Sequence, residues 1–146
     1  MKLSKLTDYG VVLLSFLAAG SGKSKSATVL AQETGIPGPT VAKLMKMLAR
    51  HGLVTSTRGI AGGYRLSAPA DQVSVAQIIS AIEGPIALAA CVEASDDLCA
   101  NEPTCGVAGN WESVNHAVKT ALENVTLADM APDWRTLFPK IQKELA

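Results

Sequence analysis

The strongest constraint on the fold is a pair of short amphipathic helices joined by a tight turn. Ser26 is suited to cap the first helix, over residues 27–34, and Gly35 ends it. Pro39 favours the start of the second, because the N–H that proline lacks would be unbonded at a first helical position anyway. This second helix runs to about His51. Its apolar stripe at i, i+3, i+4 and i+7 consists of Val41, Leu44, Met45 and Leu48.

A β-hairpin is predicted directly after this pair. Residues 53–57 are rich in β-branched side chains, residues 58–63 hold three glycines, and residues 64–67 return as a second strand. Helix, turn, helix and hairpin, in that order, are typical of a winged helix-turn-helix, in which the hairpin is the wing. We therefore expect a mainly α fold with a small β-hairpin wing.

Further helices frame this unit. Helical spacing of apolar residues predicts one over about residues 4–19 and a long C-terminal one from about Trp111 to Val125. Ser74 and Gln77 form a capping box that opens a helix through Ile82. A shorter amphipathic piece is expected in the tail, around Trp134, Leu137 and Ile141. The expected parts are a winged helix-turn-helix domain over residues 1–84, a cysteine-bearing loop over 85–109, and a helix with a tail over 110–146.

Charge divides the chain into two unlike halves, although its formal net charge is zero. Residues 1–70 carry nine Lys or Arg against two Asp or Glu, a net charge of +7. Residues 71–146 carry four Lys or Arg against eleven Asp or Glu, a net charge of −7. This asymmetry indicates that the first half faces a polyanion, although two ordinary solvated surfaces would carry the same charges.

Composition narrows the class of protein. A chain with 48% hydrophobic and 4% aromatic residues can bury a core and favours helices over a β-sandwich. Its apolar run from Val11 to Ala19 is far shorter than the roughly 20 residues of a membrane span. No signal peptide is visible, so we expect a cytoplasmic protein without a membrane partner. No nucleophile–base pairing and no phosphate-binding glycine loop is found, so an enzyme is not expected.

The second helix of the pair has the side chains that a major-groove reader needs. Early residues of such a helix reach base edges, and longer cations reach phosphates. Glycines let the tip of the wing approach a sugar–phosphate backbone closely. A basic helix alone is often only a solvated one, but helix pair, wing and positive half together favour double-stranded DNA as the partner. The expected contacts are Thr40, Lys43, Lys46 and Arg50 on the helix, and Arg58, Gly59, Gly62 and Arg65 on the wing.

Three cysteines fall in one polar, irregular stretch with the spacing Cys91-x7-Cys99-x5-Cys105. An odd number of cysteines in a reducing compartment does not suggest disulfides. Thiolates are soft ligands that suit iron–sulfur clusters, zinc or copper(I). Structural zinc sites usually have closer cysteine pairs, a thiol switch needs only two cysteines, and inert buried thiols fit poorly in a loop this acidic. The residues alone leave these interpretations open.

Three further segments are distinctive: residues 5–10 (KLTDYG), 56–66 (STRGIAGGYRL) and 78–85 (IISAIEGP). They resemble the Rrf2 type of bacterial repressors, which includes IscR, NsrR and the regulators of SUF iron–sulfur assembly operons. The resemblance covers about residues 1–125. It implies homodimers on near-palindromic operators, with the helix after the cysteine loop as the dimerisation helix. It also favours an iron–sulfur cluster on the three cysteines.

The resemblance also bears on the fourth ligand of such a cluster. In IscR-like members a His lies three residues after the last cysteine, and Ala108 holds that position here. In NsrR-like members an Asp in the first helix of the partner subunit completes the site, and Asp8 matches it. Asp8 is therefore the expected fourth ligand, and its alternative role is a helix-start charge favoured by the helix dipole. Further side chains that can serve are Glu93, Asp96, Asp97, Glu102 and His116.

The expected function is a cluster-dependent transcription regulator, a repressor of iron–sulfur cluster assembly genes, with [2Fe–2S] preferred over [4Fe–4S]. The nearest alternative is a nitric-oxide- or redox-sensing repressor of the same family. A regulator with structural zinc or a thiol switch is a further one. A metal-storage or cluster-carrier protein would leave the wing and the basic half without a purpose.

Overall fold

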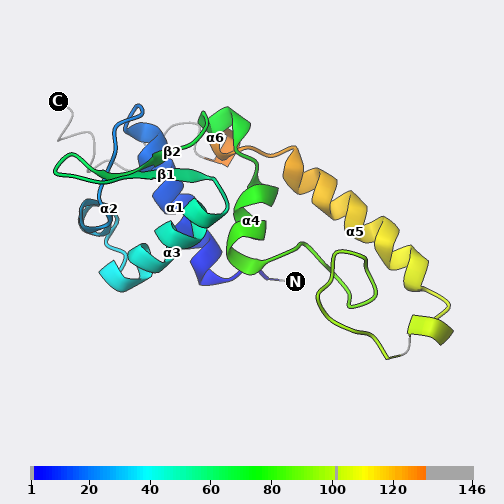
Figure 1. The fold of residues 1–146 in the computed structure, drawn as a ribbon. Coiled ribbons are helices and arrows are strands. Elements are labelled where there is room, and N and C mark those ends of the chain that lie inside the picture. The colour runs from blue at the N-terminus through cyan, green and yellow to red at the C-terminus, as the bar shows by residue number, and fades with distance from the viewer. Residues whose placement is uncertain (1, 101, 131–146) are drawn as a thin grey trace.

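The computed structural model describes residues 2–100 and 102–130, whose path is shown in Figure 1. Its elements are α1 (Lys5–Ala19), α2 (Ala27–Thr34), α3 (Gly38–Arg50), β1 (Val54–Thr57), β2 (Gly63–Leu66), the 3-10 turn η1 (Ala70–Gln72), α4 (Val75–Glu83), the 3-10 turn η2 (Glu102–Thr104), α5 (Ala108–Glu123) and α6 (Leu127–Met130). The expected mainly α fold with one hairpin is confirmed. No described helix is both long and apolar enough to cross a membrane. The amphipathic piece expected around Trp134 lies outside the described residues.

Local capping signals set the ends of α2 and α4. The Ser26 side chain accepts a hydrogen bond from the backbone N–H of Val29, and Gly35 ends α2 in a left-handed conformation with φ of 75°. Ser74 and Gln77 form the predicted capping box at the start of α4. These capping bonds join residues within one helical turn of each other. Local sequence is therefore enough to locate both helices.

Helices α1 to α4 share one apolar core. The predicted stripe of α3 is fully buried in it, and this places the basic side of α3 toward solvent. Leu127 of α6 is also buried in this core. The backbone holds α6 there, because the Leu127 N–H donates to the Val73 carbonyl at 2.7 Å and the Val75 N–H donates to the Val125 carbonyl at 2.8 Å.

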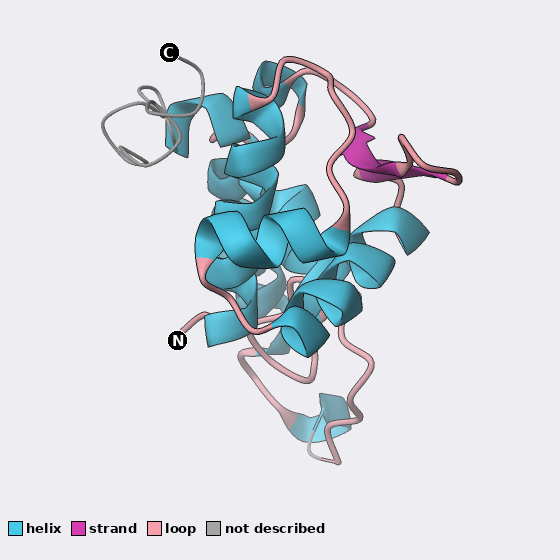
Figure 2. Ribbon diagram, turned by 90° about the vertical axis from the view of Figure 1, so that its left-hand side faces the viewer, coloured by secondary structure: helices cyan, strands magenta, loops and turns pink. Residues whose placement is uncertain are grey.

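The wing is an antiparallel hairpin in which Val54 pairs with Leu66 and Thr57 with Gly63. It lies at one edge of the helical body (Figure 2). Its strand β2 is joined to the turn before α2, since Lys25 and Tyr64 exchange two backbone hydrogen bonds of 2.9 and 2.8 Å. No local sequence pattern predicts this pairing, because it joins residues far apart in the chain.

Helix α5 extends away from the body formed by α1 to α4, beside the segment that carries the cysteines (Figure 1). It begins at Ala108 and ends at Glu123, slightly earlier at both ends than predicted. Its apolar stripe serves two surfaces. Val118 and Leu122 face α4 within the chain, whereas Trp111 and Val114 are 43% and 45% exposed.

Candidate nucleic-acid interface and cysteine loop

The predicted DNA-reading side chains of α3 lie at the surface. Lys43, Lys46 and Arg50 are exposed, and Thr40 in the first turn is half-buried. Pro37, the N-cap residue, makes no side-chain bond to the helix. The N–H groups of the first turn are therefore available to bind a phosphate, as they are at helix N-termini in general. The contacts of these residues with DNA stay predictions.

The tip of the wing is a tight turn, in which the Gly62 N–H donates to the Gly59 carbonyl at 3.0 Å. Gly59 has a φ of +108°, and a Cβ on Gly62 would lie 2.5 Å from the Thr57 carbonyl oxygen. Both glycines are thus required by the hairpin itself, in addition to the close DNA approach expected of them. The flanking Arg58 and Arg65 are exposed, as a phosphate contact requires.

The three cysteines lie in the irregular segment between α4 and α5, and all are free and half-buried. They are neither paired as disulfides nor sealed in the core. Within residues 2–100 and 102–130, no group of three or more His, Cys, Asp or Glu is arranged to hold a metal. Within one chain, the described residues therefore do not bring the three thiols together, and they do not bring Asp8 to the thiols. Three accessible thiols do fit an iron–sulfur cluster as a donor set, provided that the loop draws them together.

Asp8 is exposed in the first turn of α1, where a helix N-terminus favours a carboxylate. The turn that carries it is tied to the end of α4. Glu83 Oε1 accepts hydrogen bonds from the Thr7 hydroxyl at 2.5 Å and from the Ser4 N–H at 2.7 Å. The Thr7 hydroxyl foremost, and then the Ser4 N–H, hold the pKa of Glu83 below its ordinary value, because they stabilise the carboxylate.

This contact between Glu83 and Thr7 joins, within one chain, the start of α1 near Asp8 to the end of α4. Thr7 is buried directly before Asp8, and Glu83 is the last residue of α4 before the cysteine segment. Neither residue stands out in the sequence as a functional one. Only the packing of α1 against α4 reveals that they meet.

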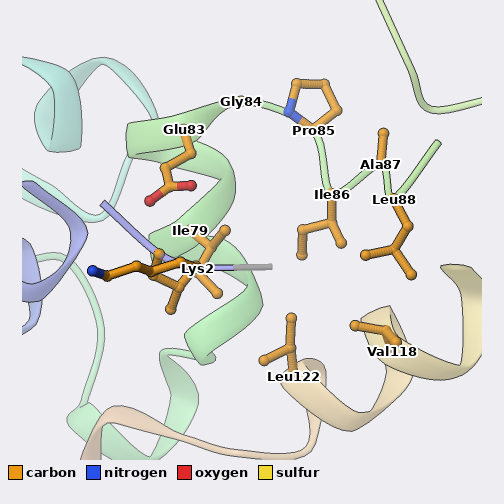
Figure 3. Close-up of a pocket in the computed structure, with 11 residues that line it drawn as sticks. Lys2, Ile79, Glu83, Gly84, Pro85, Ile86, Ala87, Leu88, Val118 and Leu122 are labelled. Carbon is orange, nitrogen blue, oxygen red and sulfur yellow. The ribbon is translucent and has the colours of Figure 1, made fainter. Parts of the chain in front are cut away.

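A groove of about 540 Å³ lies where α4, the start of the cysteine segment and α5 meet (Figure 3). Its apolar lining includes Ile79, Ile86, Leu88, Val118 and Leu122. The segment after α4 thus lies against α5 before it reaches the first cysteine, and it does not extend into solvent there.

Comparison with known proteins gives the family. The model of the Rrf2 family, described as iron-dependent transcriptional regulators, matches residues 3–133. The chain is 30% identical over 130 residues to protein aau3 of Rhizobium meliloti (strain 1021), covering 89% of this chain and 84% of that protein.

Solved structures agree. CymR of B. subtilis, a global cysteine regulator, is 31% identical with a TM-score of 0.66, over 90% of this chain and 97% of that one. IscR of T. potens is 30% identical with a TM-score of 0.62, over 91% and 88%. The oxidized form of Staphylococcus aureus CymR is 30% identical with a TM-score of 0.62, over 90% and 96%. This chain therefore belongs to the Rrf2 family of DNA-binding transcription regulators.

Proposed function

We propose that this chain is a repressor whose affinity for its operator depends on an iron–sulfur cluster held by Cys91, Cys99 and Cys105. The observation that carries the proposal is three free, half-buried thiols on one segment of a chain from a family of iron-dependent regulators. A [2Fe–2S] cluster is preferred over [4Fe–4S], and the target genes are those of iron–sulfur cluster assembly, as the resemblance implies.

The DNA-reading surface of this repressor is the outer side of α3 together with the wing. Lys43, Lys46 and Arg50 meet phosphates, and Thr40 reaches base edges from the first turn of α3. Arg58 and Arg65 bind the backbone on either side of the wing. Their exposure supports this assignment, since a buried cation would be unavailable to a phosphate.

The fourth ligand of the cluster comes from a second copy of the chain. Asp8 is exposed, and within one chain it does not join the cysteines in a metal-holding group. The partly exposed apolar side chains Trp111, Val114 and Val125 support a self-complementary surface on α5. The three parts expected at residues 1–84, 85–109 and 110–146 then act as reader, sensor and dimer contact.

Such a cluster would supply metal–ligand bonds that respond to iron supply or oxidants. The residues of the chain would transmit that response to the relative position of the two subunits. Cys91, Cys99 and Cys105 of one subunit and Asp8 of the other would hold the cluster, and the cysteine segment of each subunit would then be tied to α1 of its partner. Because α1 packs against α3, the spacing of the two reading helices follows, and with it the affinity for a near-palindromic operator.

The first experiment is a visible absorption spectrum, with iron and acid-labile sulfide counts, on protein purified without oxygen. We expect broad charge-transfer bands with matched iron and sulfide. The bands should be lost in Cys99→Ala, weakened in Asp8→Ala and unchanged in Asp71→Ala, a control that removes an exposed carboxylate from η1. Colourless protein, with zinc or without metal, would contradict the proposal and leave the DNA-binding half standing.

A second candidate is a regulator that responds through its thiols directly. It is favoured by the accessibility of all three cysteines and by the likeness to two CymR structures, one named as a cysteine regulator and one as an oxidized form. This candidate requires colourless protein whose operator affinity changes on oxidation of the thiols. A coloured protein that loses its operator affinity on exposure to nitric oxide would instead indicate the nitric-oxide sensor.

A further inference from the structure

The most buried position of α5 is occupied by a polar residue. Among the α5 residues whose side chains are described, Asn115 alone is buried, at 3% exposed. Its Oδ1 accepts from the Leu88 N–H at 2.9 Å, and its Nδ2 donates to the Ile86 carbonyl at 3.0 Å. A buried amide is unfavourable unless both ends are bonded, so these two backbone groups explain the presence of Asn here.

A second contact lies nearby on the same helix. The Glu112 Oε2 accepts from the Glu93 N–H at 2.8 Å. Between these two attachments Val92 is buried at 3% exposed, and its carbonyl accepts from the Ser95 N–H at 2.9 Å. The segment from Ile86 to Glu93 is thereby fastened to α5 at both ends.

Cys91 lies inside the fastened stretch, whereas Cys99 and Cys105 lie farther along the chain than its last attachment. The three cysteines are thus unequal in position although all are half-buried. The stretch that carries Cys91 is held on α5 at Leu88 and at Glu93 and is short, whereas the stretch from Glu93 to the start of α5 at Ala108 is longer and keeps more conformational freedom.

We propose that Asn115, assisted by Glu112, is a positioning residue that holds Cys91 in place on α5. Cys91 is a fixed thiol, and Cys99, in the middle of the longer stretch between Glu93 and α5, moves to join it. The role of Cys91 as a cluster ligand rests on the proposed function, but its fastening to α5 does not. The same hydrogen bonds link the cysteine segment directly to the helix that carries the exposed apolar stripe.

The test is the rate at which iodoacetamide alkylates each cysteine in reduced, metal-free protein, followed by peptide mass spectrometry. Asn115→Leu replaces the amide with an apolar side chain of similar size and so removes both hydrogen bonds. We expect it to raise the Cys91 rate about threefold or more, because local opening then exposes this thiol. The rates at Cys99 and Cys105 should stay near wild type. Ser113→Ala, an exposed change on the same helix, is the matched control.

Two results would overturn the proposal: an unchanged Cys91 rate in Asn115→Leu, or an equal rise at all three cysteines, which indicates general loosening. Glu112→Ala gives an independent variant in case Asn115→Leu unfolds, and it should raise the Cys91 rate in the same selective way. In anaerobically purified protein, Asn115→Leu should also lower bound iron per chain while Ser113→Ala does not. If wild-type protein is colourless, the proposed function fails, and the alkylation rates still decide the positioning of Cys91.

Discussion

At the scale of single residues, Glu83 shows how a carboxylate can fasten two distant segments. Its pKa is lowered from the ordinary 4.5 in the folded chain, foremost by the hydrogen bond from Thr7 and then by that from Ser4. A carboxyl group with a depressed folded pKa stabilises the protein above its unfolded pKa. That contribution is lost as the pH falls through the folded value. The contact between α1 and α4 is therefore an acid-sensitive one.

Thr7→Val removes the hydroxyl donor and keeps the shape of a buried side chain. Because Glu83 itself is exposed, we expect the free energy of unfolding near pH 7 to fall by only about 1 kcal/mol. The difference from wild type should shrink as the pH falls below the ordinary pKa of 4.5 and through the lowered pKa of the folded chain, where the carboxylate becomes protonated. Urea denaturation at pH 7 and at low pH measures both quantities. Thr28→Val, at an exposed site on α2, is the control, and a gap between wild type and Thr7→Val that is equal at both pH values would contradict the assignment.

Residues also show where prediction from the sequence ends. Caps such as Ser26 and Ser74 act on the N–H groups of their own helix, so local sequence reveals them. Glu83 and Asn115 act on backbone or side chains that are distant in sequence, and their types alone carry no signal. The cysteines were recognised by residue chemistry and spacing. Their spacing could not show that the described residues of one chain do not bring the three thiols together in a metal site.

At the scale of elements, α3 and the wing are predicted well because their patterns are periodic and local. Every residue of α3 that was predicted to be buried is buried. Strands β1 and β2 begin and end within one residue of the expected strands. The attachment of the wing to the turn before α2 escaped prediction. There Lys25 pairs with the Tyr64 backbone and forms a 2.8 Å ion pair with Glu33. Such a pairing between distant segments depends on the packed core, not on local pattern.

The two elements can be tested as separate sources of phosphate contacts. Lys43→Ala on α3 and Arg58→Ala on the wing should each reduce the slope of log affinity against log salt by about one unit. Fluorescence anisotropy at several salt concentrations, on an operator selected from random duplexes, measures the slope. Lys119→Ala on α5 is the control, because that lysine is exposed but lies outside the predicted DNA surface. Unchanged slopes in both test variants would rule out this docking.

At the scale of the whole molecule, the exposed part of the α5 stripe predicts a homodimer. Trp111→Asp places a charge among the exposed apolar side chains, and we expect it to convert dimers to monomers because a buried, unpaired carboxylate is strongly unfavourable. Analytical ultracentrifugation measures the assembly state. Thr120→Asp, also exposed on α5, is the matched control. A wild-type protein that is monomeric at all concentrations, or a dimeric Trp111→Asp, would refute the assignment.

The attachment of α5 to the body at one end has a mechanical consequence. The hydrogen bonds around Val125 and Leu127 act as a fulcrum, and the 16 residues of the helix extend from it. At 1.5 Å per residue this arm is about 24 Å long, so a rotation of roughly ten degrees carries its Ala108 end by about 4 Å. Asn115 in the middle of the helix and Glu112, nearly one turn closer to Ala108, attach the cysteine segment to this arm. A small rotation near the fulcrum is thus enlarged at Glu112 and at the cysteine segment fastened there, and a force applied at that segment is transmitted to α4 through the helix.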